Sequence, residues 1–251
     1  MTPQIPGYVL AFESTVTPLV GAIALALIWM GAARMEAPAQ SRYTTAGALS
    51  VALIAWLAVA QYVGSANTYF ATTEAAVPTI LFGLLIPLIA AAISLWLSGS
   101  IASLVYAIPL PWIVAAQIYR VAGGIFLVLW ADGRLPWQFA LPAGIGDVAT
   151  GGFAVVVAAL LAQKAAGARR AAYAWCLFGI ADLALAVTMG ALTSPGLPHL
   201  LALDAPNLLI TSYPLVMIPT FAVPLALILH GLVLRRLRRE TASTTGRLAV
   251  A

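Results

Sequence analysis

Residues 78–97 of the chain read PTILFGLLIPLIAAAISLWL, a stretch of twenty positions without a charged side chain. A helix that rises about 1.5 Å per residue needs about 20 apolar residues to cross the ~30 Å hydrocarbon core of a bilayer. This stretch therefore predicts a transmembrane helix. The whole chain has the same character, because 63% of its 251 residues are hydrophobic and only 8% are charged. Soluble domains contain roughly 45–50% apolar residues.

Six further apolar runs between polar breaks bring the predicted number of membrane spans to seven. The expected spans are Thr15–Arg34, Tyr43–Val63, Pro78–Leu97, Val105–Trp130, Trp137–Gln163, Ala171–Leu192 and Leu208–Leu234. An earlier start of the first span, near Tyr8, would bring Glu13 close to the membrane surface. Pro109 and Pro111 stand near the start of the fourth span, so its first turn is expected to be a loop.

The predicted fold class is therefore all-α: a polytopic membrane protein formed by one bundle of seven transmembrane helices. The single domain covers residues 1–239. Residues 240–251 are small and polar, which predicts a flexible cytoplasmic tail. The first 17 residues contain no Lys or Arg, so they lack the positive region that opens a signal peptide, and the first apolar segment is expected to be retained.

The basic residues predict an orientation. Of the twelve Lys and Arg residues, ten follow spans one, five and seven, on one side of a seven-span chain: Arg34, Arg42, Lys164, Arg169, Arg170, Arg235, Arg236, Arg238, Arg239 and Arg247. Cytoplasmic loops are enriched in Lys and Arg, so we expect the N-terminus outside and the C-terminus in the cytoplasm. The cluster Arg235–Arg239 also explains the pI near 9.5 without nucleic acid. It either contacts anionic lipid or anchors the topology.

Three charged residues fall inside the predicted spans: Arg120 in span four, Asp147 in span five and Asp182 in span six. An ionisable group in hydrocarbon is costly unless it is paired or faces water. All three lie near the middle of consecutive spans, and each has glycines at helical spacing, such as Gly123 and Gly179. Small residues let helices approach closely or leave a cavity beside a polar group. We therefore expect an Arg–Asp–Asp cluster at mid-membrane.

The charges of this cluster do not balance. One Arg and two ionised Asp leave a net charge of −1 in a medium of low dielectric constant, so either one carboxyl is protonated or a cation joins the set. On this hypothesis Arg120 organises a site in which Asp147 and Asp182 carry the proton or cation, with Gln117 one turn before Arg120. The alternative is a structural Arg–Asp bridge beside a neutral second Asp.

Span seven contains Pro214, Pro219 and Pro224. Each proline removes a backbone donor and clashes with the preceding turn, so the helix is expected to be kinked or partly unwound. Broken membrane helices often line binding sites because they expose carbonyl groups and helix termini. Tyr213 and Thr220 could supply hydroxyl groups to such a site.

His230 is placed near the cytoplasmic end of span seven, about 10 Å along the membrane normal from the Arg/Asp layer at 1.5 Å per residue. It is either a proton relay or a hydrogen-bonded core group. Span seven lacks the lysine that a retinal protein needs, since the only lysine is Lys164. With His199 in an outer loop, two-histidine haem ligation is excluded, whereas a single-histidine haem at His230 is not.

No cofactor and no metal site are predicted. The single cysteine and two histidines of the chain are too few for a typical zinc site, and no HExxH, GxSxG or phosphate-loop motif occurs. An enzyme would have to work through carboxylate or Arg chemistry. The motifs favour a protein that is not an enzyme, without deciding the question.

Three segments together resemble uncharacterised bacterial seven-span integral membrane proteins: Gln117-Ile-Tyr-Arg120, Leu135-Pro136 leading to Gly146-Asp147, and the run from Pro219 to His230. The resemblance covers about the second half of the chain. It implies a multi-pass protein of the bacterial inner (plasma) membrane in which Arg120, Asp147 and His230 are motif positions. It implies no activity.

The main hypothesis is an integral membrane protein that binds, and in its extended form transports, a small cationic or proton-coupled solute at a polar pocket formed by spans four to seven. One alternative is an accessory or structural subunit of a larger membrane complex. The other is a membrane enzyme that modifies lipids or quinones. Expected partners are membrane lipids, a small-molecule ligand and either further copies of the chain or another subunit, but not nucleic acid.

Overall fold

The computed structural model describes residues 3–71, 79–196 and 198–248, with side chains up to residue 239. Over these residues every regular element is helical and no strand occurs. The elements are α1 (Gly7–Arg34), α2 (Ala39–Ser65), α3 (Ile80–Leu97), α4 (Gly99–Ala107), α5 (Leu110–Ala115), η1 (Ala116–Gly124), α6 (Ile125–Ala131), α7 (Trp137–Ala162), α8 (Ala168–Thr193), η2 (Ile218–Ala222) and α9 (Val223–Leu248).

Seven helical segments of the described chain are long and apolar enough to cross a membrane, as the sequence predicts. They are α1, α2, α3, the continuous rod α5–η1–α6, α7, α8, and η2 with the first part of α9. This number of apolar segments suggests a multi-pass membrane protein. Side chains on the outside of such a bundle can be apolar because lipid, and not water, surrounds them.

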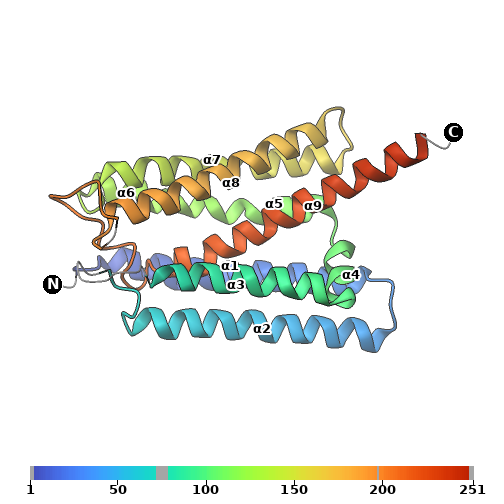
Figure 1. The fold of residues 1–251 in the computed structure, drawn as a ribbon, viewed down its shortest axis with the longest axis horizontal. Helices are drawn as coiled ribbons and strands as arrows, with labels where there is room; N and C mark the ends of the chain where they lie inside the picture. The colour runs from blue at the N-terminus through green and yellow to red at the C-terminus, as the bar shows by residue number, and fades with distance from the viewer. Residues whose placement is uncertain (1–2, 72–78, 197, 249–251) are drawn as a thin grey trace.

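The helices form two groups with α9 running obliquely between them (Figure 1). One group contains α1 to α4, and the other contains α5–η1–α6, α7 and α8. Helix α7 packs against η1, α5, α6 and α8, while α9 contacts α3, α5 and α8. The N- and C-termini lie at opposite ends of the bundle (Figure 1), and the α1–α2 and α7–α8 connections lie at the C-terminal end. The basic residues that flank these connections therefore gather at the same end as the basic part of α9.

The prediction for span four is wrong at its start. The expected span began at Val105, but the chain folds into α4, breaks at Ile108–Pro109, and begins the spanning rod at Leu110. Pro109 lacks the donor that would continue α4. Arg236 of α9 donates from Nη1 to the carbonyl oxygens of Tyr106 (2.5 Å) and Ile108 (2.7 Å), so the acceptors left free by the break are satisfied.

The prediction for span seven is also wrong at its start. Instead of a helix from Leu208, residues 199–217 form an ordered connection, and the helix begins with the π-helical turn η2 at Ile218. Pro219 lies in this turn, which agrees with the expected partial unwinding. The indole Nε1 of Trp56 donates to the carbonyl oxygen of Thr220 (3.1 Å). The opening of the helix is therefore held by a side chain from α2.

The remaining boundaries agree with the expected spans within a few residues, and α1 begins at Gly7, which agrees with the alternative start near Tyr8 and not with Thr15. Pro78, the predicted start of span three, lies outside the described residues. The predicted flexible tail, residues 240–251, also lies outside the residues whose side chains are described, although the α9 backbone continues to Leu248.

Gly31 tests the close approach of α1 to α4. A Cβ atom at this position would lie 2.6 Å from the carbonyl oxygen of Leu104, whereas one at Gly47 of α2 would meet nothing within 4 Å. We expect Gly31→Ala to lower the free energy of unfolding by about 1–3 kcal/mol, because the backbones must separate. Gly47→Ala should be neutral or stabilising by up to about 1 kcal/mol. Thermal unfolding of both variants in detergent checks this, and equal behaviour would contradict the packing.

Candidate functional site

Arg120 occupies the centre of the bundle on η1 and is 3% exposed. Its Nε and Nη2 atoms lie 2.8 and 2.7 Å from Oδ1 of Asp147 on α7. Nη2 also pairs with Oδ2 of Asp182 on α8, and Nη1 donates to the carbonyl oxygen of Gly179 (3.3 Å). The predicted Arg–Asp–Asp cluster is thus formed. All three guanidinium nitrogens have partners, as a cation buried away from water requires.

His230 belongs to the same cluster, although the predicted spans placed it about 10 Å away from the charged layer. Its Nε2 atom lies 3.3 Å from Nη1 of Arg120, and its Nδ1 atom lies 3.3 Å from Sγ of Cys176. A guanidinium has donors only, so Nε2 must accept and the proton of a neutral imidazole must reside on Nδ1. The ring also packs against Trp175, with 4.8 Å between ring centroids. His230 is therefore a hydrogen-bonded core group that holds the guanidinium.

The expected distance of about 10 Å between His230 and the charged layer was wrong because the last helix starts later than predicted. His230 lies twelve residues after Ile218, and Asp182 lies eleven residues before Thr193, where α8 ends. Both ends lie on the same side of the bundle (Figure 1), so the two residues share one depth. If the helix is assumed to start at Leu208, ten residues before Ile218, His230 is placed almost three helical turns too close to the C-terminal end of the bundle.

Three glycines allow these side chains to cross between helices. An added Cβ atom at Gly123 of η1 would clash with the carboxyl of Asp147, and one at Gly146 of α7 would clash with that of Asp182. At Gly179 of α8 the added atom would lie 2.5 Å from both Cε1 and Nε2 of His230. Each polar side chain therefore lies over a glycine of the neighbouring helix.

The two carboxyls differ in access. The Asp182 side chain is 5% exposed, against 14% for Asp147. Each carboxyl meets Arg120 through one oxygen, Oδ1 of Asp147 and Oδ2 of Asp182. Asp147 lines two cavities, whereas Asp182 lines neither. It is therefore the carboxyl of the cluster that an incoming group can reach.

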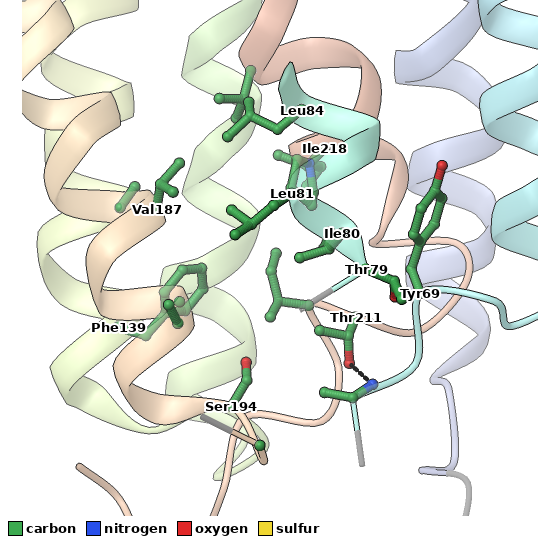
Figure 2. Close-up of a pocket in the computed structure, with 18 of the residues that line it drawn as sticks. Tyr69, Thr79, Ile80, Leu81, Leu84, Phe139, Val187, Ser194, Thr211 and Ile218 are labelled. Carbon is green, nitrogen blue, oxygen red and sulfur yellow. Dashed lines mark hydrogen bonds between the residues drawn. The ribbon is translucent and has the colours of Figure 1, made fainter. Parts of the chain in front are cut away.

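The first cavity has a volume of about 100 Å³ and lies between α3, α7, α8 and η2. Leu81, Phe139, Val187 and Ile218 make its wall almost entirely apolar, as Figure 2 shows. Ser194 and Thr211 lie toward the bottom of the view, where Thr211 Oγ1 accepts from the backbone amide of Ala71 (3.2 Å), and Thr79 and Tyr69 lie to the right. This part of the cavity lies at the end of the bundle opposite the basic residues.

The second cavity, of about 40 Å³, lies between η1, η2 and α1, and it brings in a residue that sequence reasoning missed. Glu13 of α1 lines it together with Arg120 and Asp147 and is only 4% exposed. Its Oε2 accepts from Thr17 (2.7 Å), while Oε1 has no described hydrogen-bond partner. Helix α1 begins at Gly7, close to the alternative start expected near Tyr8, and Glu13 is buried inside the bundle. A fifth ionisable group thus lies beside Arg120, Asp147, Asp182 and His230.

Three predicted site residues lie apart from the cavities. Gln117 is fully buried one turn before Arg120, and neither of its amide atoms has a described hydrogen-bond partner. The Tyr213 hydroxyl accepts from Gln61 Nε2, and the Thr220 hydroxyl donates to the carbonyl oxygen of Val216 (2.7 Å). None of the three lines the two cavities that Asp147 shares. Tyr213 and Thr220 instead hold the irregular start of the last helix.

His230 does not fit a haem ligand. The side chain is fully buried, one ring nitrogen faces Arg120 and the other faces Cys176. No lone pair of the imidazole is left for iron. Among the residues that the structure describes, no group of three or more His, Cys, Asp or Glu side chains is placed to hold a metal ion.

Residues 75–238 match the family model described as domain of unknown function DUF8737, which is more than half of the chain. The chain therefore belongs to this family. The matched region contains Arg120, Asp147, Asp182 and His230, whereas Glu13 lies before it. No curated protein and no solved structure matches the chain. The resemblance to an uncharacterised family is confirmed, and it supplies no activity.

Gly179 tests the glycine contacts of the cluster. Gly179→Ala places a methyl group against the imidazole of His230, whereas Gly152→Ala on the outer face of α7 meets nothing within 4 Å. We expect the first variant to lose about 1–3 kcal/mol of unfolding free energy, because a tightly packed core cannot accept the extra atom. The second should lose nothing. Thermal unfolding in detergent gives the comparison, and a neutral Gly179→Ala would refute this arrangement.

Proposed function

We propose that this member of the DUF8737 family binds a small solute at Asp147. The solute is either a monovalent cation, such as a protonated organic amine, or a molecule that binds together with a proton. The observation that carries the proposal is the position of Asp147. Arg120 neutralises only one negative charge, and Asp147, unlike Asp182, lines both cavities. A carboxylate in this position gains most from a partner that brings a positive charge or a proton.

The walls of the first cavity support an organic solute in preference to a bare ion. Ligand sites are mostly apolar and contain few polar groups that fix orientation. Here the wall is aliphatic and aromatic, with Phe126 and Phe139 near one another and Asp147 among the few polar residues. A ligand with a compact apolar body and one ammonium group matches this wall. The small volume of about 100 Å³ favours a short amine.

Transport is the extended form of the proposal. The second cavity also reaches Asp147, and Glu13 offers a second carboxyl there. Both cavities are bordered by irregular helix, since η1 is a nine-residue 3-10 stretch and η2 is a π turn. Runs of this kind inside a helix often mark places where a helix changes shape. A shift of η2 would alter the access of Asp147 to each cavity.

The orientation and location are part of the same proposal. The basic residues gather at one end of the bundle, which favours an outside N-terminus and a cytoplasmic C-terminus. The first cavity would then open toward the outside. The bacterial inner membrane is the membrane that the sequence resemblance implies.

Benzylammonium is a suitable probe because it joins a compact ring to one positive charge. We expect the purified full-length protein in detergent to bind it, and Asp147→Asn to weaken binding roughly 30-fold, about 2 kcal/mol, because the charge partner is lost. Asp204→Asn, in the exposed α8–η2 connection, removes the same charge and should leave binding unchanged. Isothermal titration calorimetry gives both affinities.

Two outcomes would overturn the proposal. One is an unchanged affinity for benzylammonium in Asp147→Asn. The other is no binding of benzylammonium, methylammonium or sodium by the wild-type protein together with purification of a stoichiometric partner, which would favour an accessory subunit. The unfolding temperature of each variant, measured in the same detergent, shows whether the fold is retained.

A further inference from the structure

A larger cavity lies away from the charged cluster, on the other side of α9. It has a volume of about 480 Å³ and is lined by residues from α1, α2, α3, α4, α5 and α9. Pockets that hold small molecules usually measure about 300–1,000 Å³. The lining is almost wholly aliphatic, with Trp56 and Ser94 as exceptions. We call it the lateral cleft.

The lateral cleft opens toward the lipid between α2 and α3. Val59 of α2 and Ile86 of α3 both line it, and they are 59% and 62% exposed. Helix α2 packs mainly on α1 and α4, while α3 packs on α9, η2 and α4, so α2 and α3 stay apart. An apolar groove open to the bilayer needs an apolar occupant, because packing contacts are lost wherever its wall faces empty space.

The basic end of the bundle meets the inner end of the lateral cleft at α4. Leu104, Val105 and Ile108 line the cleft. Tyr106 follows Val105 in the sequence, and Cζ of Arg239 lies 4.3 Å and Cζ of Arg235 lies 5.5 Å from the centroid of its ring. Leu232 of α9, three residues before Arg235, also lines the cleft. The two cations therefore neighbour cleft residues on both α4 and α9.

These two cations lack a counter-charge. Among the side chains that the structure describes, no acidic group forms an ion pair with Arg235 or Arg239. The two residues are four apart on α9, and like charges at that spacing repel each other. A cation on an aromatic face gains roughly 0.5–1 kcal/mol at an exposed site, which does not replace an anionic partner. An anion bound between them would relieve the repulsion.

We propose that the lateral cleft binds one anionic phospholipid, with an acyl chain between α2 and α3 and the phosphate at Arg235 and Arg239. The apolar groove and the paired cations meet at one end. A phospholipid is complementary to this arrangement, because its apolar acyl chains are joined to a negatively charged phosphate. A second copy of the chain is a poorer occupant. In the same membrane orientation it would bring its own basic end to the same level, where like charges repel. This proposal does not depend on Asp147 or on the proposed cation.

Binding of the phosphate at Arg235 and Arg239 is tested with phosphatidylglycerol and phosphatidylcholine that carry identical acyl chains. Native mass spectrometry of the full-length protein, titrated with each lipid, should show preferential retention of phosphatidylglycerol. The double variant Arg235→Gln/Arg239→Gln should lose roughly tenfold or more of that preference, since each basic residue contributes to anionic lipid binding. The control Lys164→Gln/Arg170→Gln removes two exposed charges from the same end and should keep it.

Binding of the acyl chain is tested by a substitution that places a large side chain in the lateral cleft. Ala52 of α2 lines the lateral cleft, whereas Ala58 on the same helix is exposed and does not. Ala52→Phe should reduce retention of phosphatidylglycerol several-fold, and Ala58→Phe should not. Equal retention of the two lipids by the wild-type protein, an equal effect of the two double variants, or a lipid-free dimer that Ala52→Phe disrupts would each overturn the proposal.

Discussion

The structure depends on one requirement: a guanidinium at the centre of an apolar bundle must have each of its nitrogens bonded. Arg120 meets it with partners from three other helices, namely Asp147 on α7, the Gly179 carbonyl and Asp182 on α8, and His230 on α9. No single helix could supply them. The charge thus fixes the relative depth and rotation of four spans, which dispersion forces between apolar helices in lipid specify only weakly.

Several local features follow from this requirement. His230 must be an acceptor toward Arg120, which places its proton beside Cys176. Glycines must stand where a polar side chain passes the next helix, as at Gly123, Gly146 and Gly179. The arginine has two carboxyl partners and neutralises one, so the second is the source of the proposed affinity for a cation. Asp147 thus bonds Arg120 and also lines both cavities, so the clamp and the proposed site share this residue.

The number of spans could be predicted because bilayer thickness fixes the length of an apolar helix. The Arg120–Asp147–Asp182 cluster could be predicted because isolated charges are too costly at mid-membrane. The depth of His230 could not, since hydropathy does not reveal that residues 208–217 remain outside the helix. Glu13 was missed as a site residue because the sequence does not show that its side chain turns inward, into the cavity beside Arg120. Gly146 stood in the quoted motif, but only coordinates show that Asp182 lies over it.

The most direct test of the central claim compares the unfolding free energies of Arg120→Leu and of the triple variant Arg120→Leu/Asp147→Leu/Asp182→Leu in the same detergent. Removing one partner of a buried ionic cluster costs roughly 3–5 kcal/mol, because the remaining charges are left uncompensated. The account predicts that the single variant suffers this loss and that the triple variant recovers most of it. A triple variant that is no more stable than Arg120→Leu would contradict the account, because the loss would then not arise from uncompensated charges.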